Sequence, residues 1–316
     1  MGTAPRKGST HMAALPKVDK IWMDGKLVDW DDAKVHVLTH ALHYGSGVFE
    51  GIRCYATDDG PAVFRLTEHM ERLHRSAKMM RMEIPYSVEE LVDATKALIA
   101  ANKLPACYIR PLVYRGYGVM GLDPMPAPVE TMIAVWPWDT YLGEEALTDG
   151  IAAGISSWRQ RGNNAVPPQI KATGSYMNSS FARMEANDHG YAEAIMLNEA
   201  GYVCEGTGEN IFVVRDEVIM TPPVSDGILE GITRDTVIAL AQDLDFDIIE
   251  VSLTRADLYT ADEVFFTGSA AEVVPVHSVD HREIGKPGPI TLALQKAYFD
   301  VVRGKDPEYD YWLERV

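Results

Sequence analysis

The first part of the chain alternates apolar and polar residues with the short period of β-strands. Segments 20–23 and 26–29 flank an Asp-Gly dipeptide, which is typical of a two-residue hairpin turn. A second hairpin is predicted from 51–55 to 62–65, through an Asp-Asp-Gly turn. These four strands open the first of two predicted structural units.

The period then changes to that of α-helices. After Thr67, the predicted N-cap, apolar residues recur at helical spacing and form the inward face of one helix: Met70, Leu73, Ala77 and Met80. A capping box at 87–90 opens a second helix, whose predicted inward face is Leu91, Thr95, Leu98 and Ile99. Two strands follow, near 106–117 and 131–138, so the first half is predicted to be an α+β unit.

The second half is predicted to contain both strands and helices. A strand near 150–157 precedes an irregular segment, 159–173, and a helix from 175 to about 189. The remaining predicted elements are strands near 192–198, 201–204, 210–215, 247–252, 262–267 and 273–279, and helices at 233–245, after Thr254, and at 289–303.

A length of 316 residues suits two domains of α/β size. We expect a smaller N-terminal α+β domain at 18–137, an interdomain loop at 138–148, and a larger C-terminal domain at 149–316. Residues 1–17 begin without the apolar h-region of a signal peptide, so a disordered leader or tag is expected there.

Composition excludes several classes of function. Acidic residues outnumber basic ones, 46 to 29, for a formal charge of −17, which disfavours binding to nucleic acid or to an anionic membrane. No apolar run is long enough to span a membrane. The three cysteines, Cys54, Cys107 and Cys204, are too scattered for a disulfide framework or a zinc site and fit a reducing cytoplasm.

Two motifs are weaker than they look. Residues 116–121 match G-x-G-x-x-G, but the three prolines that follow at alternate positions prevent the helix that a dinucleotide fingerprint requires. Three histidines, His36, His40 and His43, lie close in sequence without a carboxylate to complete a metal site. Packed or capping histidines are the stronger interpretation, and no metal is expected.

Lys171 is the most informative candidate for chemistry. It follows a diproline and precedes small residues and Tyr176, and it is the only lysine between Lys103 and Lys286, an interval that holds nine arginines. A lone amine in a loop of small residues is a candidate Schiff-base nucleophile. By position alone, an ordinary solvated lysine remains an alternative.

A lysine that holds pyridoxal phosphate needs partners for the phosphate and for the ring nitrogen. Two Gly-then-hydroxyl loops, around Thr233 and Ser269, are candidate anion sites, and the first opens a helix. Arg72 is a candidate cation for the same phosphate, with a solvated helix face as the alternative. Glu205, in a glycine-rich loop, is a candidate partner for the ring nitrogen, with a charged hairpin loop as the alternative.

These residues belong to a set of motifs that resembles the branched-chain amino acid aminotransferases, a fold-type IV family of pyridoxal phosphate enzymes. Eight stretches match in family order from about residue 20 to the C-terminus: 40–45, 48–55, 69–73, 108–111, 171–176, 205–210, 231–235 and 268–272. The resemblance implies a two-domain fold like that of D-amino acid aminotransferase, with a small α+β domain and a larger, mixed, β-barrel-like domain that carries helices.

The resemblance implies a cofactor role for each matching position. Lys171 would form the Schiff base and shuttle the proton, Glu205 would pair with the ring nitrogen, and Tyr176 would lie near the phenolic oxygen. The other cofactor-binding residues, most of them around the phosphate, would be Arg72, Leu229, Ile232, Thr233 and Ser269. Ser269 stands where threonine is common in the family, and its hydroxyl is retained.

The resemblance also implies a substrate site. Tyr108, with the backbone of Ser269 and Ala270, would receive the α-carboxylate, and Arg110 would take the distal carboxylate of glutamate. The other implied substrate-binding residues, most of them walls of an aliphatic pocket, are Tyr44, Phe49, Arg53, Trp138, Tyr141 and Leu229. In this family residues such as Tyr44 cross from a partner subunit, so a homodimer or larger homo-oligomer is implied.

The implied activity is reversible ping-pong transfer of an amino group from leucine, isoleucine or valine to 2-oxoglutarate. Two alternatives keep the fold and the cofactor: a D-amino acid or (R)-amine transaminase, and an aminodeoxychorismate lyase. A third is a non-enzymatic relative. Stretches 48–53 and 108–111 favour the branched-chain group.

Overall fold

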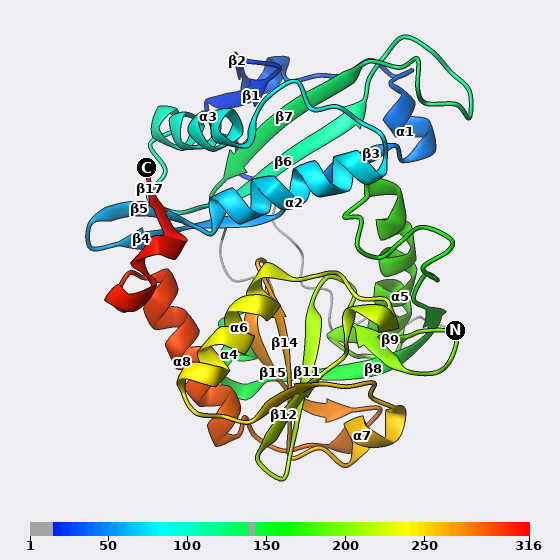
Figure 1. Ribbon diagram of the computed structural model, residues 1–316, viewed down its shortest axis with the longest axis vertical. Helices are drawn as coiled ribbons and strands as arrows, with labels where there is room; N and C mark the ends of the chain where they lie inside the picture. The colour runs from blue at the N-terminus through cyan, green and yellow to red at the C-terminus, as the bar shows by residue number, and fades with distance from the viewer. Residues whose placement is uncertain (1–14, 139–142) are drawn as a thin grey trace, which may run out of the picture.

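Two β-sheets, one for each half of the chain, form the framework of the protein (Figure 1). The computed structural model describes residues 15–138 and 143–316. The first sheet has the order β17-β5-β4-β6-β7-β1-β2, with β3 beside β6. Its strands are β1 (Lys20–Met23), β2 (Lys26–Asp29), β3 (Gly47–Phe49), β4 (Ile52–Thr57), β5 (Gly60–Phe64), β6 (Cys107–Arg115), β7 (Val129–Trp136) and β17 (Leu313–Arg315).

Both predicted hairpins of the first half are confirmed. At the turn between β1 and β2, Asp24 and Gly25 have φ values of 43° and 82°, the left-handed conformation that a two-residue hairpin turn requires. The Asp24 carboxylate also accepts a hydrogen bond of 2.8 Å from the backbone N–H of Thr131 in β7. This bond fixes the hairpin at the edge of the sheet.

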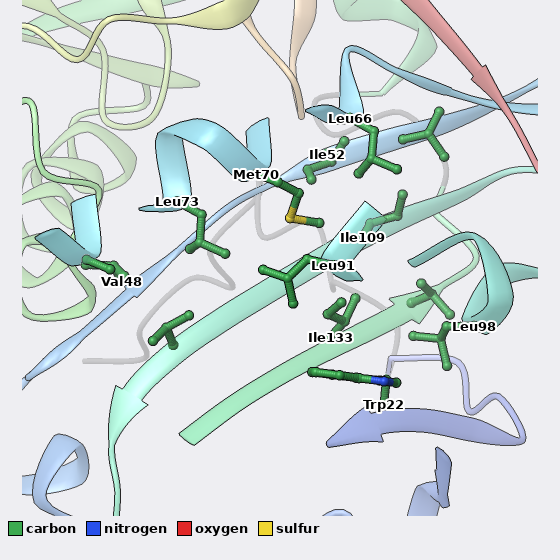
Figure 2. Packing of buried hydrophobic residues seen from close by; sticks show 14 of the residues in the cluster. Trp22, Val48, Ile52, Leu66, Met70, Leu73, Leu91, Leu98, Ile109 and Ile133 are labelled. Carbon is green, nitrogen blue, oxygen red and sulfur yellow. The ribbon is translucent and has the colours of Figure 1, made fainter. Parts of the chain in front are cut away.

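Two long helices, α2 (Leu66–Met79) and α3 (Val88–Ala101), cover one face of the first sheet. The predicted capping box of α3 is present, since Ser87 accepts from the N–H of Glu90 and Glu90 accepts from the N–H of Ser87. The residues predicted to face inward on both helices are buried or half-buried in the core. Figure 2 shows Met70, Leu73, Leu91 and Leu98 packed against residues of the sheet.

The predicted N-cap of α2 is wrong. The helix starts at Leu66, after Arg65 in a left-handed conformation, so Thr67 lies inside the first turn. The N–H and the hydroxyl of Thr67 donate to Glu314, 247 residues further along the chain, at 2.8 and 2.7 Å. A carboxylate from the C-terminal strand therefore satisfies the N-terminus of α2, where the helix dipole favours negative charge.

The second sheet closes into a barrel. Its order is β10-β9-β8-β15-β14-β11-β12-β13, and β10 also pairs with β11, so the ring from β10 to β11 is complete. Strand β8 runs parallel to β9 and β15, whereas β14 is antiparallel to its neighbours, which confirms a mixed barrel. Its strands are β8 (Ile151–Arg159), β9 (Glu193–Leu197), β10 (Val203–Glu205), β11 (Asn210–Arg215), β12 (Val218–Thr221), β13 (Ile248–Glu250), β14 (Glu263–Gly268), β15 (Glu272–Val279) and β16 (Arg282–Glu283).

Helices surround the barrel and fill the connections. The α-helices not yet named are α1 (His40–Tyr44), α4 (Glu144–Asp149), α5 (Tyr176–Asp188), α6 (Ile232–Asp243), α7 (Arg255–Tyr259) and α8 (Pro289–Val302). Short 3-10 helices lie at η1 (Trp30–Asp32), η2 (Thr173–Ser175), η3 (Val224–Asp226) and η4 (Pro307–Trp312). None of the helices in the described part of the chain has the length and apolar character needed to cross a membrane.

The last strand returns to the first half of the molecule. Strand β17 pairs antiparallel with β5, so the predicted C-terminal unit of 149–316 gives its final residues to the first sheet (Figure 1). Arg65 reinforces this joint, because its N–H donates to the Trp312 carbonyl at 2.7 Å and its guanidinium donates to Asp235 of α6 at 2.7 Å. The two halves are thereby connected on one side of the cavity described next.

Candidate active site

A cavity that opens to solvent lies between the two halves of the molecule. Its wall combines residues from both sheets and their loops, as expected for a site that only the complete fold assembles. The lining residues are Phe49, Gly51, Arg72, Tyr108, Arg110, Trp138, Lys171, Tyr176, Gly208, Glu209, Asn210, Leu229, Gly231, Ile232, Thr233, Thr267, Gly268, Ser269 and Ala270.

Lys171 lies at the centre of this cavity, on the segment between β8 and η2. The first half of the chain holds its backbone on both sides, since its carbonyl accepts from the Phe49 N–H at 3.0 Å and its N–H donates to the Ser76 hydroxyl at 3.3 Å. Its Nζ donates to the hydroxyl of Tyr176 at 2.9 Å. The amine is therefore positioned through bonds to both halves of the chain.

The surroundings of the Lys171 amine favour its charged form. Burial alone lowers the pKa of an amine, but the nearby Tyr176 hydroxyl and the Glu50 carboxylate outweigh burial, so the pKa of Lys171 is raised from its ordinary value. The Nζ also lies 5.2 Å from the centre of the Phe49 ring, within reach of a cation–π interaction.

One end of the cavity is built to hold an anion. Helix α6 starts there without a side-chain cap, so the backbone N–H groups of Ile232 and Thr233 face the cavity without an intrahelical acceptor. The preceding residue, Gly231, has to be glycine because an added Cβ would lie 1.9 Å from the Asn210 side-chain oxygen. The Thr233 and Ser269 side chains add hydroxyls to the same wall.

Arg72 completes the anion-binding end. Its Nε and one Nη donate to the two oxygens of Glu50, both at 2.8 Å, and its other Nη donates to the Glu230 carbonyl at 2.7 Å. A guanidinium has five N–H groups, so two are left to point into the cavity. This donor set, two backbone N–H groups, two hydroxyls and a guanidinium, fits a phosphate group.

Glu205 faces a smaller, adjoining cavity that it shares with Lys171 and Tyr176. Its carboxylate accepts from the Leu229 N–H at 3.0 Å and from the side chains of Gln160 and Asn210 at 2.5 and 3.3 Å. Burial raises the pKa of Glu205 to about 7, against these hydrogen bonds and the positive charges nearby. A buried carboxyl group whose charged form is supported by hydrogen bonds and nearby positive charges is suited to pair with a protonated ring nitrogen.

Arg110 lies on the opposite wall, among aromatic rings. Its guanidinium is 4.7 Å from the centre of the Phe49 ring and 5.4 Å from that of Tyr108, and it donates weakly to the Tyr108 hydroxyl at 3.4 Å. Its buried Nε has no hydrogen-bond partner among the described residues. A cation with spare donors in an apolar wall fits a ligand that carries both a carboxylate and an aliphatic part.

The structure brings most of the predicted site residues together, but not all. Arg53 does not line the cavity. It pairs with Glu272 at 3.3 Å, behind the wall. Tyr44 is also absent from the wall, and its exposed side chain contacts the His40 ring in α1, with the ring centres 4.6 Å apart. Tyr141 lies outside the described residues.

The histidines behave as packed or capping residues. His40 is buried, with ring nitrogens 2.7 Å from the Ser46 hydroxyl and 2.8 Å from the Gly121 carbonyl oxygen. His36 and His43 are exposed and contact backbone groups nearby.

Four residues that support this wall were not predicted from the sequence. Glu50 and His69 are almost fully buried behind Arg72, and Gln160 and Asn210 hold Glu205. A signal was available for Glu50 and His69, because each lies within a stretch that matches the family. Gln160 comes from the irregular segment before Lys171, where no periodic pattern marks it.

Comparison with known proteins now identifies the chain. Residues 47–279 match the family model for amino-transferase class IV, which covers most of the chain and makes it a class IV aminotransferase. The branched-chain-amino-acid aminotransferase of Pseudomonas aeruginosa is 50% identical over 298 residues, 94% of this chain and 97% of that protein. The chain belongs to the branched-chain-amino-acid aminotransferase family.

Solved structures agree with this assignment. The Escherichia coli branched-chain amino acid aminotransferase superposes with a TM-score of 0.93 at 47% identity, over 95% of this chain and 99% of that one. The T.th. enzyme, complexed with N-(5'-phosphopyridoxyl)-L-glutamate, gives a TM-score of 0.91 at 48% identity over 95% and 99% of the two chains. The same enzyme has been solved with 4-methylvaleric acid. The fold-type IV architecture expected from the resemblance is therefore confirmed.

Proposed function

We propose that this protein transfers the amino group of leucine, isoleucine or valine to 2-oxoglutarate with pyridoxal phosphate, reversibly and by a ping-pong mechanism. The observation that carries the proposal is the convergence of Lys171, the anion-binding end and Glu205 on one cavity and the smaller cavity beside it. The complexes of the T.th. relative support it, because one contains a phosphopyridoxyl glutamate and the other a branched aliphatic acid.

When bound, pyridoxal phosphate supplies a carbonyl that condenses with amines and a ring that accepts the electron pair released at the substrate Cα. Arg72, Ile232, Thr233 and Ser269 would hold the phosphate, and Leu229 would contact the cofactor. Glu205 would keep a proton on the ring nitrogen. Tyr176 donates near the phenolic oxygen and orients Lys171, from which it is 2.9 Å away.

The Lys171 amine acts as the proton carrier of the reaction. Its Nζ would remove the proton from the substrate Cα and deliver it again within the same site. Water would then release the 2-oxo acid, and the amino group would stay with the cofactor. The same steps run in reverse with the 2-oxo acid. The bonds to Phe49 and Ser76 keep the lysine backbone in place while its side chain moves.

Substrate recognition divides between two surfaces. Tyr108 and the Ser269–Ala270 turn receive the α-carboxylate that all substrates share. Phe49, Trp138 and Leu229 form an apolar wall for the aliphatic side chain, and Arg110 pairs with the distal carboxylate of glutamate. A charge without a partner in this wall would cost several kcal/mol, so one cation at its edge lets one pocket accept both kinds of substrate.

A substrate panel tests the proposed activity. With 2-oxoglutarate as acceptor, L-leucine, L-isoleucine and L-valine are expected to react, and chiral analysis is expected to show consumption of the L-form. Borohydride reduction of the protein with its cofactor is expected to label Lys171. Turnover of D-alanine far above that of L-leucine, or label on another residue, would contradict the proposal.

Replacing Arg110 by leucine separates the two substrate classes. The reaction with glutamate is expected to lose about 2–5 kcal/mol, or about thirtyfold or more in kcat/KM, because its distal carboxylate loses the only proposed partner. The half-reaction with leucine should change much less. Single-turnover measurements of the two half-reactions check this, and equal losses in both would assign Arg110 a structural role.

Replacing Glu205 by glutamine tests the partner of the ring nitrogen. Glutamine keeps hydrogen bonding but cannot stabilise a positive ring nitrogen, so both half-reactions are expected to slow by a factor of about 10²–10⁴. The dissociation constant for pyridoxamine 5'-phosphate should change by less than about tenfold, since the phosphate contacts remain. Comparable losses in rate and affinity would show that Glu205 only supports the structure.

We further propose that the protein works as a homodimer or larger homo-oligomer in a reducing compartment. The three cysteines are all unpaired and buried, which supports the second point. In support of the first, exposed large apolar residues gather in α1 and in the loop between β6 and β7, among them Leu42, Tyr44, Met120 and Leu122. Tyr44 would then reach the cavity of a second copy.

A further inference from the structure

A buried chain of hydrogen bonds leads away from the anion-binding end of the cavity. Ser269, which lines the cavity, has its hydroxyl 3.4 Å from Nε2 of His69. Nδ1 of His69 lies 2.7 Å from Oε2 of Glu50, and Glu50 accepts two bonds from Arg72. His69 and Glu50 are 1% and 0% exposed, so the bond between them is shielded from solvent, whereas Ser269 is half-buried at the cavity wall.

The chemistry of these groups fixes the direction of each bond. An ionised carboxylate only accepts, so Nδ1 of His69 carries the proton that is shared with Glu50. In a neutral imidazole the other nitrogen is then an acceptor. The Ser269 hydroxyl must therefore donate to Nε2, and it has no second proton to donate into the cavity. A phosphate that binds there would meet an oxygen lone pair of Ser269 in place of a donor.

The phosphate site also lacks positive charge. Glu50 neutralises Arg72, so the two side chains together bring no net positive charge to a phosphate with two negative charges. Burial lowers the pKa of His69 and outweighs the opposing effect of Glu50, so His69 is neutral before a ligand binds. The charged groups that act on His69 are Glu50 from the β3–β4 connection, Arg72 on its own helix, and Lys171 from the segment after β8.

We propose that Glu50 and His69 are positioning residues of the phosphate site, and that His69 takes up one proton at Nε2 when the phosphate binds. The inference rests on the proposed function, in which Ser269 contacts the cofactor phosphate. The new proton reverses the bond between His69 and Ser269, because Nε2 then donates to the serine oxygen. The serine hydroxyl is released to donate to the phosphate, and the imidazolium supplies the missing positive charge.

Proton counting by calorimetry tests this inference. The full chain without cofactor is titrated at pH 8 with pyridoxamine 5'-phosphate, in two buffers of different ionisation enthalpy, and with pyridoxamine as the ligand that lacks the phosphate. The phosphorylated ligand is expected to take up about one proton more than pyridoxamine. The ratio of the two affinities is expected to fall about tenfold per pH unit between pH 7.5 and 8.5.

His69→Gln provides the decisive comparison. Glutamine does not titrate, so the extra proton and the pH dependence of the affinity ratio should disappear. It also offers a permanent N–H donor to Ser269, so the affinity for pyridoxamine 5'-phosphate at pH 8.5 should be retained within about tenfold. The matched control is His74→Gln on the same helix, because the half-buried His74 is absent from the cavity wall, and this variant should behave like the wild type.

The outcomes separate the two proposals. Tight binding of pyridoxamine 5'-phosphate without the extra proton would overturn the role of His69 and leave the proposed function intact. An extra proton that persists in His69→Gln would also overturn it, because the proton would then reside elsewhere. Failure of the wild-type chain to bind pyridoxamine 5'-phosphate would contradict the proposed function itself. If the variant does not fold, the absence of an extra proton in the wild-type chain still overturns the role of His69.

Discussion

Lys171→Ala is expected to reduce transamination between L-leucine and 2-oxoglutarate by about 10⁴-fold or more. The substitution removes the only lysine among the described residues that line the cavity, and with it both the covalent attachment of the cofactor and the carrier of the Cα proton. The neighbouring Tyr176 hydroxyl lies 2.9 Å from Nζ, but it cannot form the Schiff base that attaches the cofactor through an amine. Turnover with a coupled assay for glutamate formation measures the loss.

The loss is expected to be chemical and not structural. Lys171→Ala should still bind pyridoxamine 5'-phosphate, because the phosphate contacts come from Arg72, α6 and Ser269. Lys296→Ala, at an exposed lysine on α8, is the matched control and should leave activity unchanged. Retention of more than about a hundredth of wild-type activity in Lys171→Ala would contradict its assigned role.

Elements with a local signal could be predicted from the sequence. The helix α3 has a capping box and a regular apolar face, and both hairpins have turn residues that take left-handed conformations. Each of these signals depends on neighbours in the chain, so no knowledge of the fold is needed to interpret it.

Features set by distant parts of the chain could not be predicted in this way. The N-terminus of α2 is satisfied by Glu314, and β17 joins the first sheet, because the C-terminal segment folds back across the molecule. The periodicity of apolar residues does not show that a distant segment folds back in this way. The position of Arg53 behind the wall has the same origin, since Glu272 from β15 holds its guanidinium away from the cavity.

The residues of the candidate site also differ in whether the sequence alone could reveal them. Lys171, Arg72 and Thr233 were found because motifs mark them and their chemistry suits a phosphate-bearing aldehyde. Glu50 and His69 belong to the same motifs, but their importance depends on burial and on a distance of 2.7 Å between side chains 19 residues apart. Only the assembled fold shows that the arginine is already paired before a ligand arrives.

Glu50→Gln is expected to lower the free energy of unfolding by about 3–5 kcal/mol, which is a large fraction of the stability of most proteins. Glu50 is fully buried and pairs with Arg72 through two bonds of 2.8 Å. Glutamine has nearly the same shape but no charge, so the guanidinium of Arg72 is left buried without a counter-ion. Urea denaturation of the full chain without cofactor, at pH 7, measures the difference.

The effect should depend on pH in a defined direction. Burial would raise the pKa of Glu50, but Arg72 and His69 outweigh burial and hold it well below its ordinary value of 4.5. The stabilisation is therefore fully present above pH 4.5 and is lost as the pH falls further, so wild type and variant should converge in acid. Glu71→Gln is the control, because its pair with Arg75 is half-exposed and 3.9 Å long, and it should cost less than about 1 kcal/mol. Equal effects of the two substitutions would show that the buried pair contributes no more than a surface one.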